Sequence, residues 1–232
     1  MLNVKKILSL LHLVYPEQCL VCDKEISIQE KHLCSFCTQN ISHTNFHLLE
    51  EASSMDKLFW GRVKVENTYA HIFFEKNKTS QDILFSLKYK NNSDIGVFFG
   101  KQIGETLKTQ ELYSTIDAVI PIPLHPKKQF IRGYNQSEAL AKGICSSFLK
   151  RLDINTVKRT RHSESQTKKS RFQRWDNVND IFKIKRTIEN YKHILLVDDV
   201  ITTGSTLESI IVALRKRNPE LQISVATLAI AK

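Results

Sequence analysis

Residues 193–211, HILLVDDVITTGSTLESII, run from an apolar stretch through a hydroxyl-rich loop into a helical pattern. Residues 194–197 are typical of a buried parallel strand, and the apolar residues of 207–214 recur at the spacing of one helix face. Strands and helices alternate in the same way from about Val63 to the end of the chain. This alternation predicts an α/β fold with a mainly parallel sheet.

Shorter patterns predict the other elements of that fold. Gly96, Gly100 and Gly104 recur every four residues in one predicted helix, which predicts close packing of its backbone against a neighbour. The expected elements are a strand pair at 62–67 and 70–74, helices at 80–89, 95–107 and 137–149, and strands at 116–124 and 223–231.

Two adjacent carboxylates, Asp198 and Asp199, follow the predicted strand at 194–197. Ligands of an open α/β sheet bind beyond the carboxyl ends of its strands, so both side chains are expected to project into a crevice there. The next helix presents free amides and the positive end of its dipole to the same place, which favours an anion. Gly204 allows a close backbone approach, and four hydroxyls can donate hydrogen bonds: Thr202, Thr203, Ser205 and Thr206. Carboxylates beside an anion site predict a sugar phosphate, with acceptors for the ribose hydroxyls and donors for the phosphate.

Several other classes of protein are excluded or disfavoured. The chain has neither the G-x-x-x-x-G-K-[ST] motif of P-loop nucleotidases nor the G-x-G-x-x-G motif of dinucleotide dehydrogenases. No run of eighteen apolar residues could span a membrane, and residues 1–19 lack the small-residue cleavage site of a signal peptide, so an amphipathic helix is expected there. The net charge of +10 suits phosphate-rich partners. Residues 150–175 hold nine Lys or Arg and two acidic residues, a net charge of +7.

Four of the five cysteines form two C-x-x-C pairs: Cys19, Cys22, Cys34 and Cys37. Four thiolates at this spacing predict a tetrahedral structural zinc site with no open position for catalysis. Disulfide pairing is the alternative, and a reducing compartment disfavours it. Zinc would also help to fold a segment too short to build its own core. Residues 1–50 are therefore expected to form an N-terminal helix and a zinc-binding module, and residues 51–232 a separate domain.

The chain resembles two groups of known proteins. LLVDDVITTGST resembles the phosphoribosyl pyrophosphate (PRPP) signature of type I phosphoribosyltransferases. The resemblance implies that Asp198 and Asp199 are catalytic carboxylates that hold the ribose, and that residues 202–206 hold its 5′-phosphate. PIPLHPKKQFIRGYNQSEALA and RHSESQTKKSRFQRWDNVNDIF, with LKYK at 87–90, are similar to the ComF family of competence-associated proteins. That family joins an N-terminal zinc-binding module to a phosphoribosyltransferase-like domain, and the similarity covers nearly the whole chain.

By analogy with phosphoribosyltransferases, the loop after the strand that ends at Pro121 would grip pyrophosphate. Arg132 is the expected charge-assisted contact, because a guanidinium can engage phosphate oxygens bidentately. Gly133 would permit a tight approach, and Gln136 could contribute an amide. The alternative is a solvated basic loop in which Asn135 only caps a helix. Mg²⁺ is expected to accompany PRPP.

The basic segment 161–177 has two expected uses that the sequence does not separate. As a loop that closes over bound pyrophosphate, it would supply Gln166, Lys168, Arg171 and Arg174. As a contact for single-stranded nucleic acid, it would stack bases on Phe172 and Trp175 while its cations follow the phosphates. A plain solvated basic loop is the third interpretation.

The resemblance to ComF proteins implies a cytoplasmic protein that binds PRPP and handles single-stranded DNA during natural transformation, with competence-machinery proteins among its partners. Two alternatives stay open. One is an active phosphoribosyltransferase, in which Mg²⁺ bridges pyrophosphate and ribose oxygens. The other is a regulatory module that senses PRPP without turning it over. The sequence identifies neither an acceptor nor an oligomeric state, and it leaves open whether DNA and PRPP share one surface.

Overall fold

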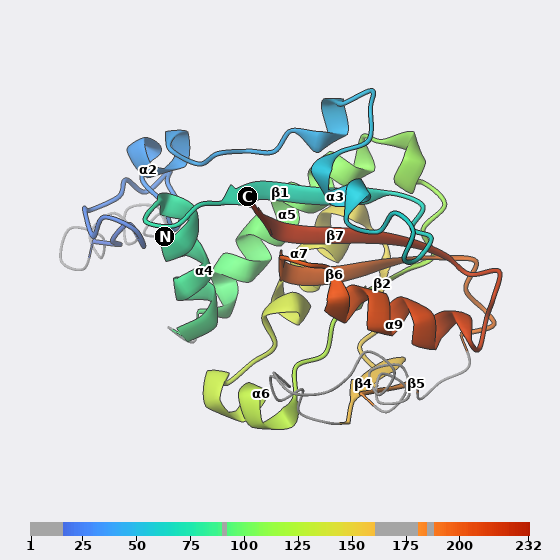
Figure 1. The fold of residues 1–232 in the computed structure, drawn as a ribbon. Helices are drawn as coiled ribbons and strands as arrows, with labels where there is room; N and C mark the ends of the chain where they lie inside the picture. Colours follow the sequence, from blue (N-terminus) through green and yellow to red (C-terminus); the bar gives the residue numbers. More distant parts are fainter. Residues whose placement is uncertain (1–15, 90–91, 161–180, 185–187) are drawn as a thin grey trace, which may run out of the picture.

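The computed structural model describes residues 16–89, 92–160, 181–184 and 188–232 (Figure 1). The expected helix at the start of the chain lies outside these residues. In chain order the elements are α2 (Ser35–Gln39), η1 (Phe46–Leu48), α3 (Ser54–Lys57), β1 (Thr68–Phe74), α4 (Thr79–Tyr89), α5 (Ser93–Lys108), η2 (Glu111–Tyr113), β2 (Ala118–Pro121), α6 (Pro126–Arg132), α7 (Gln136–Phe148), β3 (Arg151–Leu152), β4 (Val157–Arg159), β5 (Phe182–Ile184), β6 (His193–Ile201), α9 (Ser205–Arg215) and β7 (Gln222–Ala231).

The main sheet has five strands in the order β1-β7-β6-β2-β3, and every neighbouring pair in it is parallel. The predicted α/β fold with a mainly parallel sheet is confirmed. β4 and β5 form a separate antiparallel pair. β6 and β7 are the long central strands, so the carboxyl end of β6 is flanked by β7 on one side and β2 on the other.

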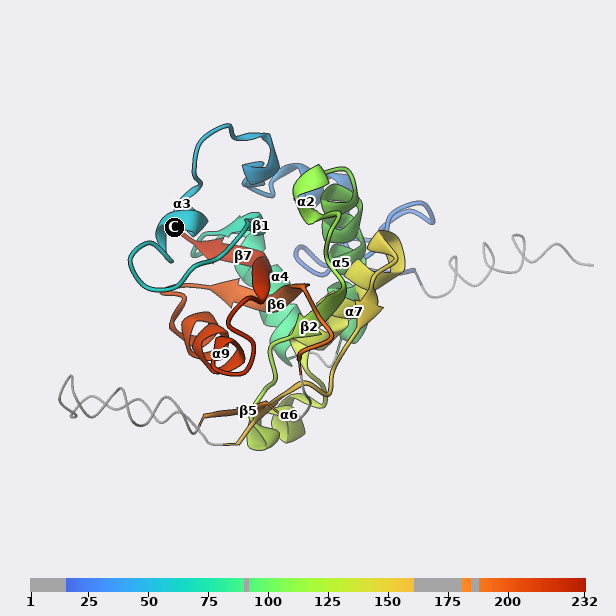
Figure 2. The same cartoon turned by 90° about the vertical axis from the view of Figure 1, so that its right-hand side faces the viewer.

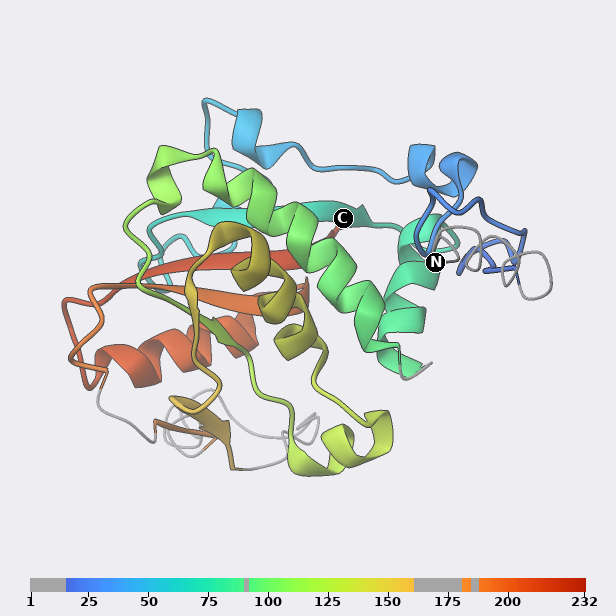
Figure 3. The same cartoon turned by 180° about the vertical axis from the view of Figure 1, so that it is seen from behind.

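Helices cover both faces of this sheet. Figures 1 and 3 show α9 against one face and α5 with α7 against the other, and Figure 2 shows the sheet between them from the side. Side chains alternate along β6 to fill the two layers, because successive residues of a strand point to opposite faces. Leu195 and Val197 join the core under α4, α5 and α7, whereas Ile194 and Leu196 pack with α9.

α5 and α7 cross at a distance that only glycine permits. A Cβ atom on Gly100 would lie 2.2 Å from the carbonyl oxygen of Leu140, and one on Gly143 would lie 2.3 Å from that of Val97. The predicted close packing of the α5 backbone is therefore confirmed. This contact fixes the direction of α7, whose first turn reaches the carboxyl end of β6.

Three of the expected strands differ from those in the structure, and one of them, β2, covers only Ala118–Pro121 of the expected 116–124. Residues 62–67 form no strand: Arg62 donates to the loop before α9, and the backbone of Glu66 and Asn67 bonds β7 instead of pairing with β1. β6 extends past Asp198 to Ile201, because Val200 and Ile201 continue the pairing with β7. The alternating pattern VKV is typical of both an extended loop and a strand. The acidic pair after Val197 was interpreted as the end of the strand, although β6 continues beyond it.

The cysteine-rich segment packs against α4, and both lie at the same end of the molecule in Figures 1 and 3. Its buried residues Cys19, Leu33 and Cys37 belong to one hydrophobic cluster with Leu84 and Leu87 of α4. The boundary near residue 50 stays a prediction. No helix in the part of the chain that the structure describes is both long and apolar enough to cross a membrane.

Candidate functional site

The loop between β6 and α9 forms a small cradle. Gly204 caps α9 with φ of 73°, a conformation that L side chains rarely adopt, and this turn sends the chain directly into the helix. Asp198 and residues 200–207 line a cavity of about 40 Å³. The Thr203 hydroxyl donates to Ser205 Oγ at 3.2 Å, while the loop surface stays open to solvent. The structure thus brings together all five predicted phosphate-binding residues: Thr202, Thr203, Gly204, Ser205 and Thr206.

Arg62 holds this loop from the side of α3. Its Nη1 donates to the carbonyl oxygens of Thr203, at 2.6 Å, and Leu58, at 2.9 Å. Its Nε donates to Glu208 Oε2 at 3.1 Å, so one guanidinium ties the loop to the first turn of α9. A larger hollow of about 590 Å³ is lined by Arg62 and other residues between 52 and 68, and none of the predicted site residues lines it.

The acidic pair occupies two different environments because Asp198 and Asp199 are adjacent in a strand. Asp198 Oδ1 accepts a hydrogen bond from Ser137 Oγ at 2.9 Å and another from the Asp199 amide at 2.9 Å. Asp199 lies 3.4 Å from Nζ of Lys88 at the end of α4, and the two side chains are only 14% and 22% exposed. Each carboxylate is therefore held by a different helix.

Burial, and then repulsion from Asp199, raise the pKa of Asp198 to about 7. The backbone and Ser137 hydrogen bonds and the charge of Lys88 act in the opposite direction but do not outweigh these two causes. The Asp198 carboxyl can thus be protonated near neutral pH, next to a second carboxyl group. Such a pair can both accept and donate hydrogen bonds to the hydroxyls of a sugar.

Residues 126–132 of the predicted pyrophosphate loop form the helix α6 instead of an irregular loop, and the chain turns after this helix at Gly133, where φ is 78°. Arg132 Nη1 donates to Gln136 Oε1 at 3.0 Å, and Gln136 is 1% exposed. The buried amide thus orients the guanidinium, which leaves the other N–H groups of Arg132 to reach outward. Asn135 caps α7, as the alternative interpretation expected, and its amide donates to the carbonyl oxygen of Ile122 at 3.0 Å.

The two predicted binding segments meet through consecutive residues of α7. Gln136 orients Arg132, and its neighbour Ser137 donates to Asp198. Tyr134 OH donates to the carbonyl oxygens of Leu87 and Asn92, the second at 3.1 Å, and so ties the same loop to α4 and α5. The predicted contacts Gln166, Lys168, Arg171 and Arg174 lie outside the described residues, and their roles stay predictions.

Four side chains of this site were missed by sequence reasoning. Lys88 lies within the LKYK segment, which contributed to the resemblance to ComF proteins but was given no role in the site. Ser137 lies two residues after Asn135, the predicted helix cap. Arg62 left no signal in the sequence, since Thr203 and Glu208, its partners at this site, are more than a hundred residues away. Burial lowers the pKa of Arg159 in β4. The negative charge of Asp198 opposes this change, because it favours the charged guanidinium.

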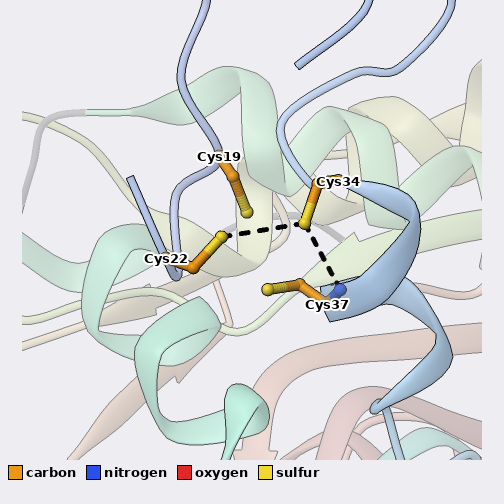
Figure 4. Close-up of side chains that lie close together, drawn as sticks. All are labelled: Cys19, Cys22, Cys34 and Cys37. Atoms are coloured by element: carbon orange, nitrogen blue, oxygen red, sulfur yellow. Dashed lines mark hydrogen bonds between the residues drawn. The ribbon is translucent and has the colours of Figure 1, made fainter. Parts of the chain in front are cut away.

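The N-terminal cysteines converge on one point, as Figure 4 shows. Their four Sγ atoms all lie within 4.8 Å of one another, and Cys22 Sγ is 3.7 Å from Cys34 Sγ. Zinc–sulfur bonds of about 2.3 Å in a tetrahedron place neighbouring sulfurs about 3.8 Å apart. All five cysteines of the chain are free thiols. The cluster could therefore bind a metal such as zinc, and the residues present fit it.

The backbone favours the thiolate form of Cys19, whereas burial raises the pKa of Cys37 in the same cluster. Burial acts to raise the pKa of Cys19, but backbone N–H groups of Cys34, Cys22 and Val21 outweigh it and lower this pKa to about 6. Cys34 Sγ accepts from the amide of Cys37 at 3.4 Å and so caps α2. Burial raises the pKa of the fifth thiol, Cys145, to about 11, which favours the thiol over the more reactive thiolate.

Comparison with known proteins agrees with this geometry. Residues 135–232 match the family described as Phosphoribosyl transferase domain, and this range begins at the cap of α7 and contains β6 and its loop. Competence protein F of Haemophilus influenzae is 29% identical over 217 residues, which cover 88% of this chain and 93% of that protein. DNA utilization protein YhgH of Escherichia coli is 24% identical over 214 residues, 85% of this chain and 90% of that protein. Competence protein ComFC of Streptococcus pneumoniae is 28% identical over 137 residues, 59% of this chain and 57% of that protein.

Proposed function

Because this chain is a ComF-family protein with a phosphoribosyltransferase-like domain, we propose that it binds PRPP and takes part in handling single-stranded DNA during natural transformation. PRPP would bind at the carboxyl end of β6, and the protein would act in the cytoplasm with other competence proteins. The domain division at residue 50 belongs to the same proposal, with zinc holding the N-terminal module together.

The observation that carries the proposal is the placement of the Asp198 carboxylate and several hydroxyl donors around the cavity at Gly204. The amides at the start of α9 and the hydroxyls of 202–206 would hold the 5′-phosphate. Asp198 and Asp199 would accept hydrogen bonds from the ribose hydroxyls. The raised pKa of Asp198 would also allow its protonated form to donate a hydrogen bond.

Pyrophosphate would lie toward α6, where Arg132 is already oriented by Gln136. Gly133 would let the backbone approach it, and Lys88 would add a second cation beside Asp199. Mg²⁺ would neutralise the pyrophosphate oxygens when PRPP is bound. The carboxylates and the PRPP oxygens are the hard ligands that this ion prefers.

Phosphoribosyl transfer is the second candidate function, and the intact acidic pair beside the phosphate cradle favours it. In such a reaction the bond from ribose C1 to pyrophosphate breaks and a bond from C1 to a nucleophilic acceptor forms. Release of pyrophosphate in the presence of an acceptor distinguishes this activity from binding alone.

The test is a calorimetric titration of the zinc-loaded protein with PRPP and Mg²⁺. The double variant Asp198→Asn with Asp199→Asn is expected to lose PRPP binding while keeping its fold and zinc content. Unchanged PRPP affinity in this variant would contradict the assignment. A matched control is Asp117→Asn, which removes a carboxylate that bonds the amides of Lys192 and His193 at the opposite end of β6.

A further inference from the structure

Exposed aromatic side chains gather on α4 and α6 and have no part in the PRPP site. Phe85 and Tyr89 lie one turn apart on α4, with ring centroids 4.9 Å apart, and they are 53% and 61% exposed. On α6, Phe130 and Ile131 are 90% and 78% exposed. Single exposed apolar residues are ordinary, but these four lie on two helices that Arg132 links through its contact with Tyr89, and groups of exposed apolar residues mark interaction sites.

Arg132 joins the two helices into one surface. Its guanidinium carbon lies 5.8 Å from the centroid of the Tyr89 ring, while Gln136 accepts one of its N–H groups. Tyr134 OH donates to the carbonyl oxygen of Leu87 and so holds the end of α4 beside the loop that follows α6. We call this surface the α4–α6 face, and its members are Phe85, Tyr89, Lys127, Lys128, Phe130, Ile131 and Arg132.

The charge of this face favours an anionic partner with planar groups. α6 has the sequence PKKQFIR, with three cations and no acidic residue, and it buries none of its side chains. Lys127 and Lys128 are exposed in its first turn. Aromatic rings that alternate with cations are the pattern by which proteins bind single-stranded nucleic acid, because bases stack on the rings and phosphates lie along the cations.

We propose that single-stranded DNA binds across the α4–α6 face. Bases would stack on Phe85, Tyr89 and Phe130, and phosphates would lie along Lys127, Lys128 and Arg132. This inference rests on the DNA part of the proposed function and gives it a surface within the described residues.

The α4–α6 face adjoins the PRPP site and shares a residue with it. Arg132 contacts Tyr89 on one side and is the expected pyrophosphate contact on the other. Lys88, next to Tyr89 in α4, reaches Asp199. One guanidinium cannot serve a DNA phosphate and pyrophosphate fully at once, so PRPP with Mg²⁺ should weaken DNA binding, and DNA should weaken PRPP binding by the same factor.

The experiment measures fluorescence anisotropy of a labelled oligothymidylate of about 20 nucleotides with the full-length, zinc-loaded protein. The test variant is Phe85→Leu with Phe130→Leu, which keeps apolar surface but removes two stacking rings. Trp60→Leu is the matched control, because Trp60 is 63% exposed and lies outside the face. Calorimetry with PRPP on each variant reports whether the fold and the neighbouring site are intact.

The expected result is that the double variant binds the oligonucleotide at least about tenfold more weakly, while the Trp60 variant and all PRPP affinities are unchanged. Equal DNA affinity in the double variant and the wild type would contradict DNA binding at the α4–α6 face but not the proposed role in handling DNA. No binding of DNA by the wild type would overturn both, and PRPP calorimetry would still test the other half of the proposed function. Displacement of the strand by thymidine monophosphate at similar concentration would overturn it in favour of a pocket for a single nucleobase.

Discussion

The cysteine cluster and the carboxyl end of β6 are assembled in opposite ways. The cluster takes its four thiols from residues 19–37, and short turns bring them together. The β6 site takes its groups from α4, α7, β6, α9 and the segment that follows α3. Four identical thiols define the first site, whereas each group of the second has a different partner.

This difference teaches where stability and function reside in the chain. The cluster lies in a segment with few buried residues of its own, so a bound metal would contribute much of its folding free energy. The β6 site stands on a core that is complete without a ligand, and it keeps an acidic pair there at a cost in stability. Substitutions should therefore affect stability most in the cluster, and ligand binding most at β6.

Cys37→Ser should have the largest effect on stability. Cys37 is 3% exposed and packs with α4, so losing a thiolate should release zinc and destabilise the protein by more than about 3 kcal/mol. Zinc content and thermal unfolding measure both effects. Cys145→Ser is the control, because that thiol lies outside the cluster, and equal losses in the two variants would remove the contrast between the sites.

Asp198→Asn should stabilise the protein at alkaline pH. The pKa of Asp198 rises from its ordinary value of 3.8 to about 7 in the folded chain, so wild-type stability falls as pH rises between these values. The variant lacks this loss and should gain on the order of 1–3 kcal/mol relative to wild type between pH 5 and pH 8. Thermal unfolding at the two pH values measures it.

Asp153→Asn provides a control of opposite sign. The Thr156 hydroxyl donates to Asp153 at 2.6 Å, the Asn155 amide at 2.8 Å and the Tyr191 hydroxyl at 2.9 Å. Burial opposes these bonds, but they lower the pKa of Asp153, so its ionised form stabilises the fold above its ordinary pKa. This variant should lose stability at both pH values. A gain that does not depend on pH in the Asp198 variant would argue against a buried, repelled carboxylate.

Lys88→Gln should have the smallest effect. The variant removes the cation beside Asp199, so PRPP affinity should fall by about 1 kcal/mol, roughly fivefold. Lys101→Gln on α5 changes the net charge equally at an exposed position and should leave PRPP affinity unchanged. If calorimetry gave the same affinity for both variants, Lys88 would be a structural partner of Asp199 only.

How much the sequence predicted follows from the same contrast. The C-x-x-C spacing was sufficient for the cysteine cluster, because all four ligands are close in sequence. The strand, loop and helix at 193–211 were also predicted, since each depends on local pattern. The partners of the acidic pair were not, because Ser137 and Lys88 reach β6 only through the crossing of α5 with α7 and the position of α4. Residues 62–67 were wrongly predicted as a strand because their alternation serves an extended loop.

Hydrogen–deuterium exchange of the zinc-loaded protein with and without PRPP and Mg²⁺ tests the central claim most directly, since it reports where the ligand binds. We predict slower exchange of the amides at 202–207, which would hold the 5′-phosphate, and of those at 132–137 near pyrophosphate. Amides in the cysteine cluster should be unaffected. Protection elsewhere with no change at 202–207 would contradict a PRPP site at the carboxyl end of β6.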